Sequence, residues 1–81
     1  MIVNVRLFAR ARELARADAV AVNLPAGATV AELRRQLATC YPALAGLVGQ
    51  SAVAVNDEFA ADVLQLHAPI EIALLPPVSG G

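Results

Sequence analysis

Side chains that commonly carry enzyme chemistry are scarce in this sequence. His67 is its only histidine and Cys40 its only cysteine, so one chain cannot supply a catalytic triad, a multi-histidine metal site or an internal disulfide. We expect His67 to lie in a surface loop or turn, and Cys40 to pack into the core as a small hydrophobic side chain. The dipeptide Asp57-Glu58 is typical of a turn. The sequence therefore predicts no metal site and no enzyme activity for the chain on its own.

The C-terminal residues are the part of the sequence that could do chemistry. They are Pro76-Pro77-Val78-Ser79-Gly80-Gly81. The fixed φ of the two prolines stiffens the exit from the domain and directs the following residues outward. Gly80 and Gly81 have no side chain, so they can enter a narrow channel of another protein and bring the terminal carboxylate to its active site. Because a carboxylate is inert toward sulfur until it is activated, we expect a partner that adenylates Gly81 and a second step that replaces the AMP. The alternative is a frayed terminus with no function.

Composition and charge argue against several other classes of protein. The hydrophobic fraction of 58% includes 18 alanines, which leaves an ordinary globular share of larger apolar residues. The uncharged stretch 36–56 has the length of a membrane span, but Pro42, Gly46 and Gly49 interrupt it. A net charge of −1 gives no basic surface for nucleic acid or for a membrane. With one cysteine and no signal-like N-terminus, we expect a cytoplasmic protein.

Periodicity predicts the elements that must position the tail. Alternating apolar residues indicate strands over residues 2–8, 20–24, 53–56 and 70–75, with a brief return strand beginning at Phe59. Residues 9–17 are strong helix formers around Leu14, and residues 44–48 indicate one more helical turn. The main helix starts at the capping box Thr29-Val30-Ala31-Glu32 and ends before Pro42. Its apolar face comprises Val30, Leu33, Leu37 and either Cys40 or Tyr41.

The order of these elements is that of an α+β fold. Two strand pairs flank one helix, and this order matches the β-grasp, or ubiquitin-like, roll, a mixed sheet packed on one main helix. In that roll the first and last strands lie side by side in the middle of the sheet. We expect residues 1–75 to form the β-grasp domain and residues 76–81 to form an extended tail that ends in Gly-Gly.

Strand parity predicts a docking surface beside the tail. If the alternate apolar residues of the first and last strands face the helix, Phe8 and Leu75 face away from it. Two large apolar side chains near Pro76 would form a patch that a monomer does not need; isolated exposed residues are the alternative. Four arginines lie close to this region and could pair with acidic groups of a partner, although a solvated role is the simpler expectation for most of them. They are Arg6, Arg10, Arg12 and Arg16.

Several motifs, spread along the whole chain, match one known family together. They are Leu7-Phe8-Ala9, Arg12-Glu13-Leu14, Pro25-x-Gly27-x-Thr29-Val30-x-x-Leu33, Val53-Ala54-Val55-Asn56 and, the most specific, Ile72-Ala73-Leu74-Leu75-Pro76-Pro77-Val78-Ser79-Gly80-Gly81. With these motifs the sequence resembles the MoaD-type ubiquitin-like sulfur carriers, the small subunits of molybdopterin synthases.

The resemblance implies a reactive C-terminus. Gly81 would be adenylated by a ubiquitin-activating-like adenylyltransferase that uses ATP, and converted to a thiocarboxylate with sulfur from a sulfurtransferase. Gly80 would enter the channel of the large synthase subunit, where the sulfur passes to cyclic pyranopterin monophosphate in molybdenum cofactor biosynthesis. The chain itself would bind no cofactor, and the assembly would be a heterotetramer of small and large subunits. Residues implied to contact partners are Phe8, Arg12, Leu75, Pro76, Pro77 and Val78.

The sequence departs from the family around its last strand, and other functions stay open. His67-Ala68-Pro69 stands where many members have an Asp-Gly-Asp turn, and Leu75 stands where an aromatic residue is frequent. We expect a different turn and an intact strand. The alternatives are a sulfur carrier for thiamine thiazole synthesis, cysteine synthesis or tRNA thiolation, a ubiquitin-like interaction module without chemistry, and a covalent protein modifier. All six basic residues are arginine, so an activated Gly81 has no lysine on its own chain to acylate.

Overall fold

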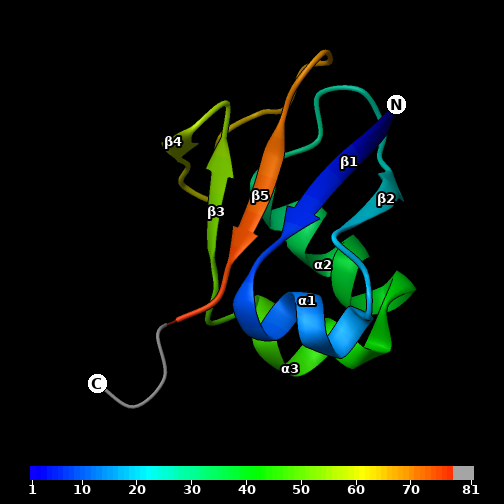
Figure 1. Cartoon of the computed structure of the whole chain (residues 1–81). Coiled ribbons are helices and arrows are strands. Elements are labelled where there is room, and N and C mark those ends of the chain that lie inside the picture. Colours follow the sequence, from blue (N-terminus) through cyan, green and yellow to red (C-terminus); the bar gives the residue numbers. More distant parts are fainter. Residues whose placement is uncertain (78–81) are drawn as a thin grey trace.

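A five-stranded mixed sheet backed by helices makes up the described part of the chain, residues 1–77 of a computed structural model (Figure 1). Its strands are β1 (Ile2–Leu7), β2 (Ala19–Asn23), β3 (Ala52–Val55), β4 (Glu58–Phe59) and β5 (Ile72–Leu75). Its helices are α1 (Ala9–Ala15), α2 (Val30–Cys40), the 3₁₀ turn η1 (Pro42–Leu44) and α3 (Ala45–Val48). Figure 1 shows α2 behind the sheet, with α1 and α3 beyond the end of β1.

The first and last strands occupy the centre of the sheet, as the β-grasp prediction requires. The strand order is β2-β1-β5-β3-β4. β1 and β5 run parallel, with Val5 opposite Ile72 and Leu7 opposite Leu74, while the other neighbours run antiparallel. The strand that leads into the tail is therefore hydrogen-bonded on both sides. This mixed sheet on one main helix is the α+β fold expected from the sequence.

The core lies between the sheet and α2, and it is built by alternation along the strands. The inward side chains of β1, β2 and β5 are buried, in the phase that the sequence predicts. They are Val3, Val5, Leu7, Val20, Val22, Ile72 and Leu74. Val30, Leu33 and Leu37 meet them from one face of α2. Burying each such side chain stabilises the fold by roughly 1.5–3 kcal/mol, so the core determines which side chains are left on the other face of the sheet.

α2 begins at the predicted cap, with one difference in its hydrogen bonds. The Oγ1 of Thr29 accepts a hydrogen bond from the Glu32 amide at 3.3 Å, as in a capping box. The Thr29 hydroxyl also donates to a carboxylate oxygen of Glu32 at 3.5 Å, whereas in a complete capping box that carboxylate accepts from the amide of the N-cap residue. The forward half of the capping box is present, and it satisfies one of the free amides at the start of the helix.

The end of α2 shows that the prediction of a buried Cys40 is wrong. The Cys40 side chain is exposed. The next residue, Tyr41, packs against the core, and its hydroxyl donates a hydrogen bond to the Ala21 carbonyl at 2.6 Å. α2 ends at Cys40, and Tyr41 leaves helical geometry with φ of −128° and ψ of 79°, so helical spacing no longer sets where its side chain points. Its ring, tied to β2 by the hydrogen bond to Ala21, is the side chain that meets the core at this end of the helix.

α1 is shorter than predicted and has a different apolar anchor. It ends at Ala15, because Arg16 adopts left-handed geometry with φ of 55°. Ala11 is its fully buried residue, while Leu14 is only partly buried against the core. A small side chain lets this short helix approach the sheet closely, so the packed residue is the small one and not the large one.

The segment His67-Ala68-Pro69 before β5 leaves the strand intact, as expected. β5 starts at Ile72 rather than at Ile70, which is partly buried. The Ala68–Pro69 peptide bond is cis, and His67 is exposed, as predicted. Ile72 and Leu74 keep the inward phase that the sequence predicts.

Candidate functional site

The face of the sheet that points away from α2, called the outer face below, has a floor of alanines. The register places Ala54 of β3 opposite Ala73 of β5, and Ala73 opposite Arg6 of β1. Opposed residues on neighbouring strands point to the same side of a sheet. Because alanine side chains are short, larger neighbours stand clear of the surface. Near the tail these larger side chains are Arg6, Phe8, Phe59 and Leu75, while Ile2 and Asn4 lie on the same face toward the far end of β1.

Phe8 and Leu75 lie on the side of the sheet that strand parity predicts. They follow the opposed and buried pair Leu7 and Leu74. Phe8 keeps extended geometry, with φ −128° and ψ 155°, at the N-cap of α1, so it continues the alternation of β1. It is 36% exposed, and Leu75 is half-buried. The outer face therefore carries apolar side chains on both central strands, at the end where the tail begins.

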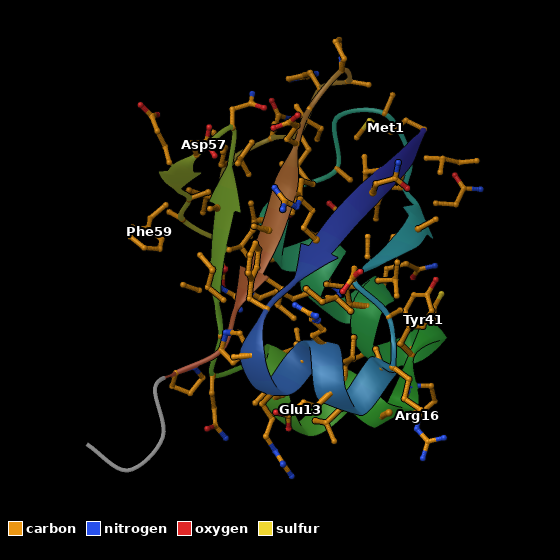
Figure 2. All side chains as sticks on the ribbon, in the orientation of Figure 1. Met1, Glu13, Arg16, Tyr41, Asp57 and Phe59 are labelled. Carbon is orange, nitrogen blue, oxygen red and sulfur yellow. The ribbon has the colours of Figure 1, made fainter. Side chains whose placement is uncertain are left out.

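Phe59 also belongs to the outer face, although it was expected only to begin a return strand and not to contact a partner. Its side chain is 79% exposed and projects from the β4 edge (Figure 2). Phe59 lies opposite Ala54, which puts it on the same side as Ala73. A signal is present in the sequence, since the two-residue turn Asn56-Asp57, with both φ values positive, sets the phase of the return strand. Two aromatic side chains thus project from the outer face.

Arg6 lies over the ring of Phe8. Its guanidinium carbon is 5.4 Å from the ring centroid, within the range of a cation–π interaction. Both side chains line a hollow of about 70 Å³, together with Asp57 and Glu71. No ion pair within residues 1–77 involves Arg6. The pairs present there are Arg10 with Glu13, Arg12 with Asp18, and Arg34 with Asp62.

The tail leaves the domain beside a groove. Pro76 is half-buried and Pro77 is exposed, and both line this groove of about 640 Å³. Its other lining residues come from α1, α3 and the residues next to them: Ala9, Arg10, Glu13, Leu47 and Gln50. Because the prolines follow β5 directly, the centre of the sheet sets the direction in which the chain leaves. Three residues of the expected site, Val78, Gly80 and Gly81, lie outside the described residues.

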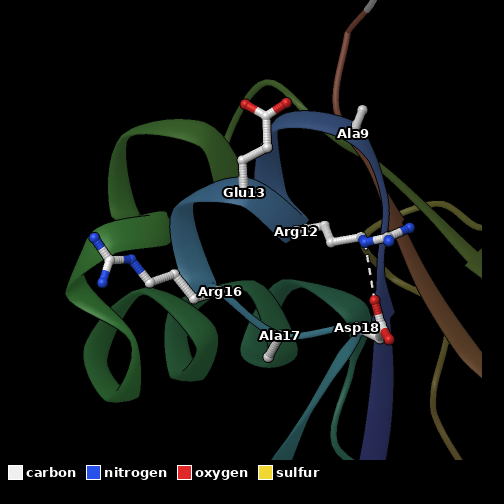
Figure 3. Close-up of a pocket in the computed structure, with 6 residues that line it drawn as sticks. All are labelled: Ala9, Arg12, Glu13, Arg16, Ala17 and Asp18. Atoms are coloured by element: carbon white, nitrogen blue, oxygen red, sulfur yellow. Dashed lines mark ion pairs between the residues drawn. The ribbon is translucent and has the colours of Figure 1, made fainter.

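Arg12 has an ion-pair partner within the chain. Its Nε lies 2.9 Å from the Asp18 carboxylate (Figure 3), and both side chains are largely exposed. The two residues line an open pocket of about 520 Å³, whose other lining residues are Ala9, Glu13, Arg16 and Ala17. Two arginines and two carboxylates balance the charge of this pocket. An exposed pair of this kind contributes roughly 0–1 kcal/mol, so a partner can recruit Arg12 at little cost.

Side chains that could bind a metal ion lie apart from one another in the described residues. Within residues 1–77 no group of three or more His, Cys, Asp or Glu side chains is placed to hold a metal ion. None of the helices in this part of the chain has the length and apolar character that a membrane crossing demands. The exposed side chains His67 and Cys40 take part in no hydrogen bond among the side-chain contacts of this region.

Known proteins with similar sequences include sulfur carriers. The chain is 33% identical over 79 residues to the molybdopterin synthase sulfur carrier subunit of Arabidopsis thaliana. The similarity covers 98% of this chain and 82% of the relative. The subunit of the same name from Chlamydomonas reinhardtii is 32% identical over 83 residues, with both chains fully covered. The resemblance seen in the motifs thus extends over the whole chain.

Solved structures show the same fold. SAMP1 from Haloferax volcanii has a TM-score of 0.87 and 34% identity, with all of both chains covered. A chain in the complex of subunits 1 and 2 of the molybdopterin-converting factor from Helicobacter pylori has a TM-score of 0.69 and 28% identity, again over all of both chains. The predicted β-grasp fold is confirmed. The model of the ThiS family matches residues 5–81, and the chain belongs to this family.

Proposed function

We propose that the chain is a sulfur carrier that serves as the small subunit of a molybdopterin synthase. The observation that carries the proposal is the similarity, over nearly the whole chain, to molybdopterin synthase sulfur carrier subunits. In this proposal the chain is not an enzyme by itself. It is the sulfur-donating subunit of a heteromeric sulfurtransferase, and its reactive group is the Gly81 carboxylate.

Activation of Gly81 is the first proposed step. An adenylyltransferase of the ubiquitin-activating type joins AMP from ATP to the Gly81 carboxylate and releases pyrophosphate. The acyl carbon of this mixed anhydride is electrophilic, so hydrosulfide displaces AMP and leaves a thiocarboxylate. Where a sulfurtransferase delivers the sulfur as a persulfide, the persulfide displaces AMP to form an acyl disulfide, and a thiol then reduces the S–S bond to release the thiocarboxylate. The thiocarboxylate donates its sulfur to cyclic pyranopterin monophosphate in the large subunit. In this proposal ATP binds to the activating partner, so the chain itself needs no cofactor. We assign these reactions to the cytoplasm.

The stem of the tail supports this role. β5 is paired with a strand on each side and continues directly into Pro76 and Pro77. A carrier must present its end to the active sites of other proteins, and a stem that is already ordered reduces the conformational entropy lost on binding. Gly80, which has no side chain, would fit the narrow part of such a channel.

The outer face supports docking of those proteins next to the tail. Phe8 and Leu75 lie on the central strands beside the tail exit, and Phe59 extends the apolar surface toward β4. Aromatic side chains and arginine are enriched in protein interfaces. The similar Helicobacter pylori chain belongs to a complex of subunits 1 and 2 of the molybdopterin-converting factor. We propose that the large subunit and the activating enzyme use this surface in turn, with contacts to Phe8, Arg12, Leu75, Pro76, Pro77 and Val78.

The intact mass of the chain tests the carrier role. The purified chain is incubated with its cognate activating enzyme, ATP and a sulfide source. We expect the mass change of one oxygen replaced by sulfur, located at Gly81 by fragmentation and absent from a reaction without ATP. An unchanged mass with an activating enzyme that releases pyrophosphate on another carrier would contradict every sulfur carrier role.

The acceptor is tested with the thiocarboxylate form. It is mixed with the candidate large subunit and cyclic pyranopterin monophosphate, and molybdopterin is measured. We expect product only from the thiocarboxylate form. If a large subunit that works with another carrier makes none, molybdopterin is the wrong acceptor, and thiamine thiazole, cysteine or tRNA thiolation becomes the route to test.

Protein modification is a second candidate function, favoured by the similarity to SAMP1, a small archaeal modifier protein. In that case the activated Gly81 acylates a lysine of another protein. The test is a tagged chain expressed with its activating enzyme, in which conjugates of higher mass disappear when Gly81 is deleted. Formation of the thiocarboxylate without any conjugate would exclude a modifier. Formation of neither product would leave the interaction module as the remaining function.

A further inference from the structure

We propose that Arg6 selects the partner of the outer face by pairing with a carboxylate that the partner places next to its binding site for Phe8. The occupant of this part of the surface is thus an acidic side chain, Asp or Glu, of the large synthase subunit. The inference rests on the proposed function, because it takes that subunit as the partner.

Arg6 is held at the centre of the sheet with little around it. Its backbone lies between two neighbouring strands, opposite Ala73 of β5 and Ala19 of β2. Both flanking side chains are alanine, so these two neighbours do not cover the guanidinium. The side chain is exposed, and the guanidinium carbon is 5.4 Å from the centroid of the Phe8 ring. The cation lies over the ring, and no side-chain hydrogen bond or ion pair within residues 1–77 occupies the N–H groups of its planar fork.

The chain supplies no ion-pair partner to this guanidinium within residues 1–77. Three of the other arginines each pair with a carboxylate. Asp57 and Glu71 line the same hollow as Arg6, but neither forms an ion pair with it. The positive charge of Arg6 therefore has no carboxylate in direct contact within residues 1–77, and it lies on the surface that is proposed to bind the partner.

A partner that covers Phe8 must also cover Arg6, since the two groups are in contact. A guanidinium that is buried in an interface loses its hydration, and without a counter-ion no new interaction offsets that loss. The free-energy penalty is then large. A carboxylate removes the penalty, because it accepts two parallel hydrogen bonds from the guanidinium fork. Acidic partners are favoured over neutral ones for this reason, and a basic surface is rejected.

Binding of the large subunit to Arg6 variants tests the proposal. Titration calorimetry with the purified subunit at low salt compares the unchanged chain with Arg6→Gln, Arg6→Lys and Arg6→Glu. We expect Kd to rise about tenfold for Arg6→Gln and about 100-fold for Arg6→Glu, since a truncated charge pair weakens a complex and a reversed one repels. Arg6→Lys should recover part of the loss, because it keeps the charge without the fork. Raising the salt concentration should increase Kd for the large subunit more with the unchanged chain than with Arg6→Gln.

Matched variants separate this interaction from other causes. Arg35→Gln removes an exposed arginine of α2 that has no ion pair within residues 1–77, and should leave Kd within about twofold. Glu71→Gln should leave Kd unchanged or slightly lower. A loss with Glu71→Gln equal to that with Arg6→Gln would show that Arg6 pairs within its own chain on docking, and would overturn the proposal.

The outcomes also separate this inference from the proposed function. Equal affinities of Arg6→Gln and the unchanged chain would refute the role of Arg6 and leave the carrier role standing. Failure of the unchanged chain to bind the large subunit or to gain sulfur at Gly81 would contradict the proposed function, and this inference with it. Urea unfolding of each variant shows whether the fold is intact, and we expect midpoints equal to that of the unchanged chain.

Discussion

Exposed aromatic and cationic side chains are the residues of this chain that folding explains least. Phe8 and Phe59 lie on the side of the sheet opposite the core, and Arg6 stands over one of the two rings. Scattered apolar residues on a surface are ordinary, but these three share one face with Leu75 and with the start of the tail. The proposed binding of a partner would cover these groups together, and it would explain why they are exposed on the same face.

Phe59 should matter for binding and not for stability. Because its side chain is 79% exposed, Phe59→Ala should change the free energy of unfolding by less than about 0.5 kcal/mol. Affinity for the large subunit should fall by about 1–2 kcal/mol, as expected for an aromatic contact inside an interface. Calorimetry and urea unfolding measure the two quantities. Ile2→Ala, at the far end of β1 and 71% exposed, is the control, and equal affinities for the two variants would contradict a role of Phe59 in docking.

Cys40 should react with thiol reagents in the folded protein. Its side chain is exposed at the end of α2, so iodoacetamide should modify one equivalent of thiol at a rate close to that measured in denaturant. Intact mass during the reaction follows the modification, and circular dichroism shows that the fold persists. Modification that begins only when the protein unfolds would place the thiol back in the core.

Two polar side chains hold the main helix in its place between the sheet and the loops. Thr29 caps the first turn of α2, and Arg34 connects the middle of α2 to two distant segments. These contacts set where α2 begins and how it lies relative to α3 and to the chain before β3. The position of α2 in the fold therefore depends in part on the hydrogen bonds of these two side chains.

The cap of α2 should contribute a measurable part of the stability. Thr29→Ala removes the acceptor for the Glu32 amide, and such a loss costs about 1 kcal/mol. Thr39 is the matched control, since its hydroxyl bonds to the Arg35 carbonyl inside the helix at 3.0 Å. Thr39→Ala should cost less than about 0.5 kcal/mol because alanine is a better helix former. Urea unfolding of both variants provides the comparison, and equal midpoints would argue against the cap.

Arg34 should contribute more to the free energy of unfolding than an ordinary surface arginine does. Its side chain is only 19% exposed, and it donates hydrogen bonds to the Val48 and Ser51 carbonyls at 2.6 and 2.7 Å and to the Asp62 carboxylate at 2.8 Å. Arg34→Ala leaves these acceptors without their donor, so the free energy of unfolding should fall by about 2–3 kcal/mol.

The neighbouring residue provides the control for Arg34. Arg35 is exposed on the same helix, and Arg35→Ala should change the stability by less than about 0.5 kcal/mol. Arg34→Lys should recover little, because one ammonium group lacks the planar fork that reaches three acceptors. A loss as small as that of Arg35→Ala would show that the three hydrogen bonds do not hold the helix.

For the molecule as a whole, the domain and the tail should be separable. One residue added after Gly81 moves the free carboxylate away from the activating site, so adenylation, measured as pyrophosphate exchange, should be abolished. The urea midpoint should not change, since the core ends with β5. Ser79→Ala keeps the length of the tail and should retain adenylation. Adenylation of the extended chain at the normal rate would contradict the terminal carboxylate as the reactive group.

Local patterns in the sequence determined the elements and the phase of the strands, and they led to the proposal that the C-terminus is the reactive end. The alternation of Val3, Val5 and Leu7 has the period of a strand, and the spacing of Thr29 and Glu32 is that of a capping box; both depend on the geometry of a few adjacent residues. Motifs along the chain indicated the family, and the parity of β1 and β5 put Phe8 and Leu75 on the correct face.

Contacts between distant residues were decided only by the tertiary structure. The place of Phe59 on the outer face depends on its pairing with Ala54, and the burial of Tyr41 in preference to Cys40 depends on β2 lying within reach of its hydroxyl. The acceptors of Arg34 are 14 to 28 residues away along the chain. Such contacts follow from sheet register and close packing, which are properties of the assembled core and leave no period in the sequence.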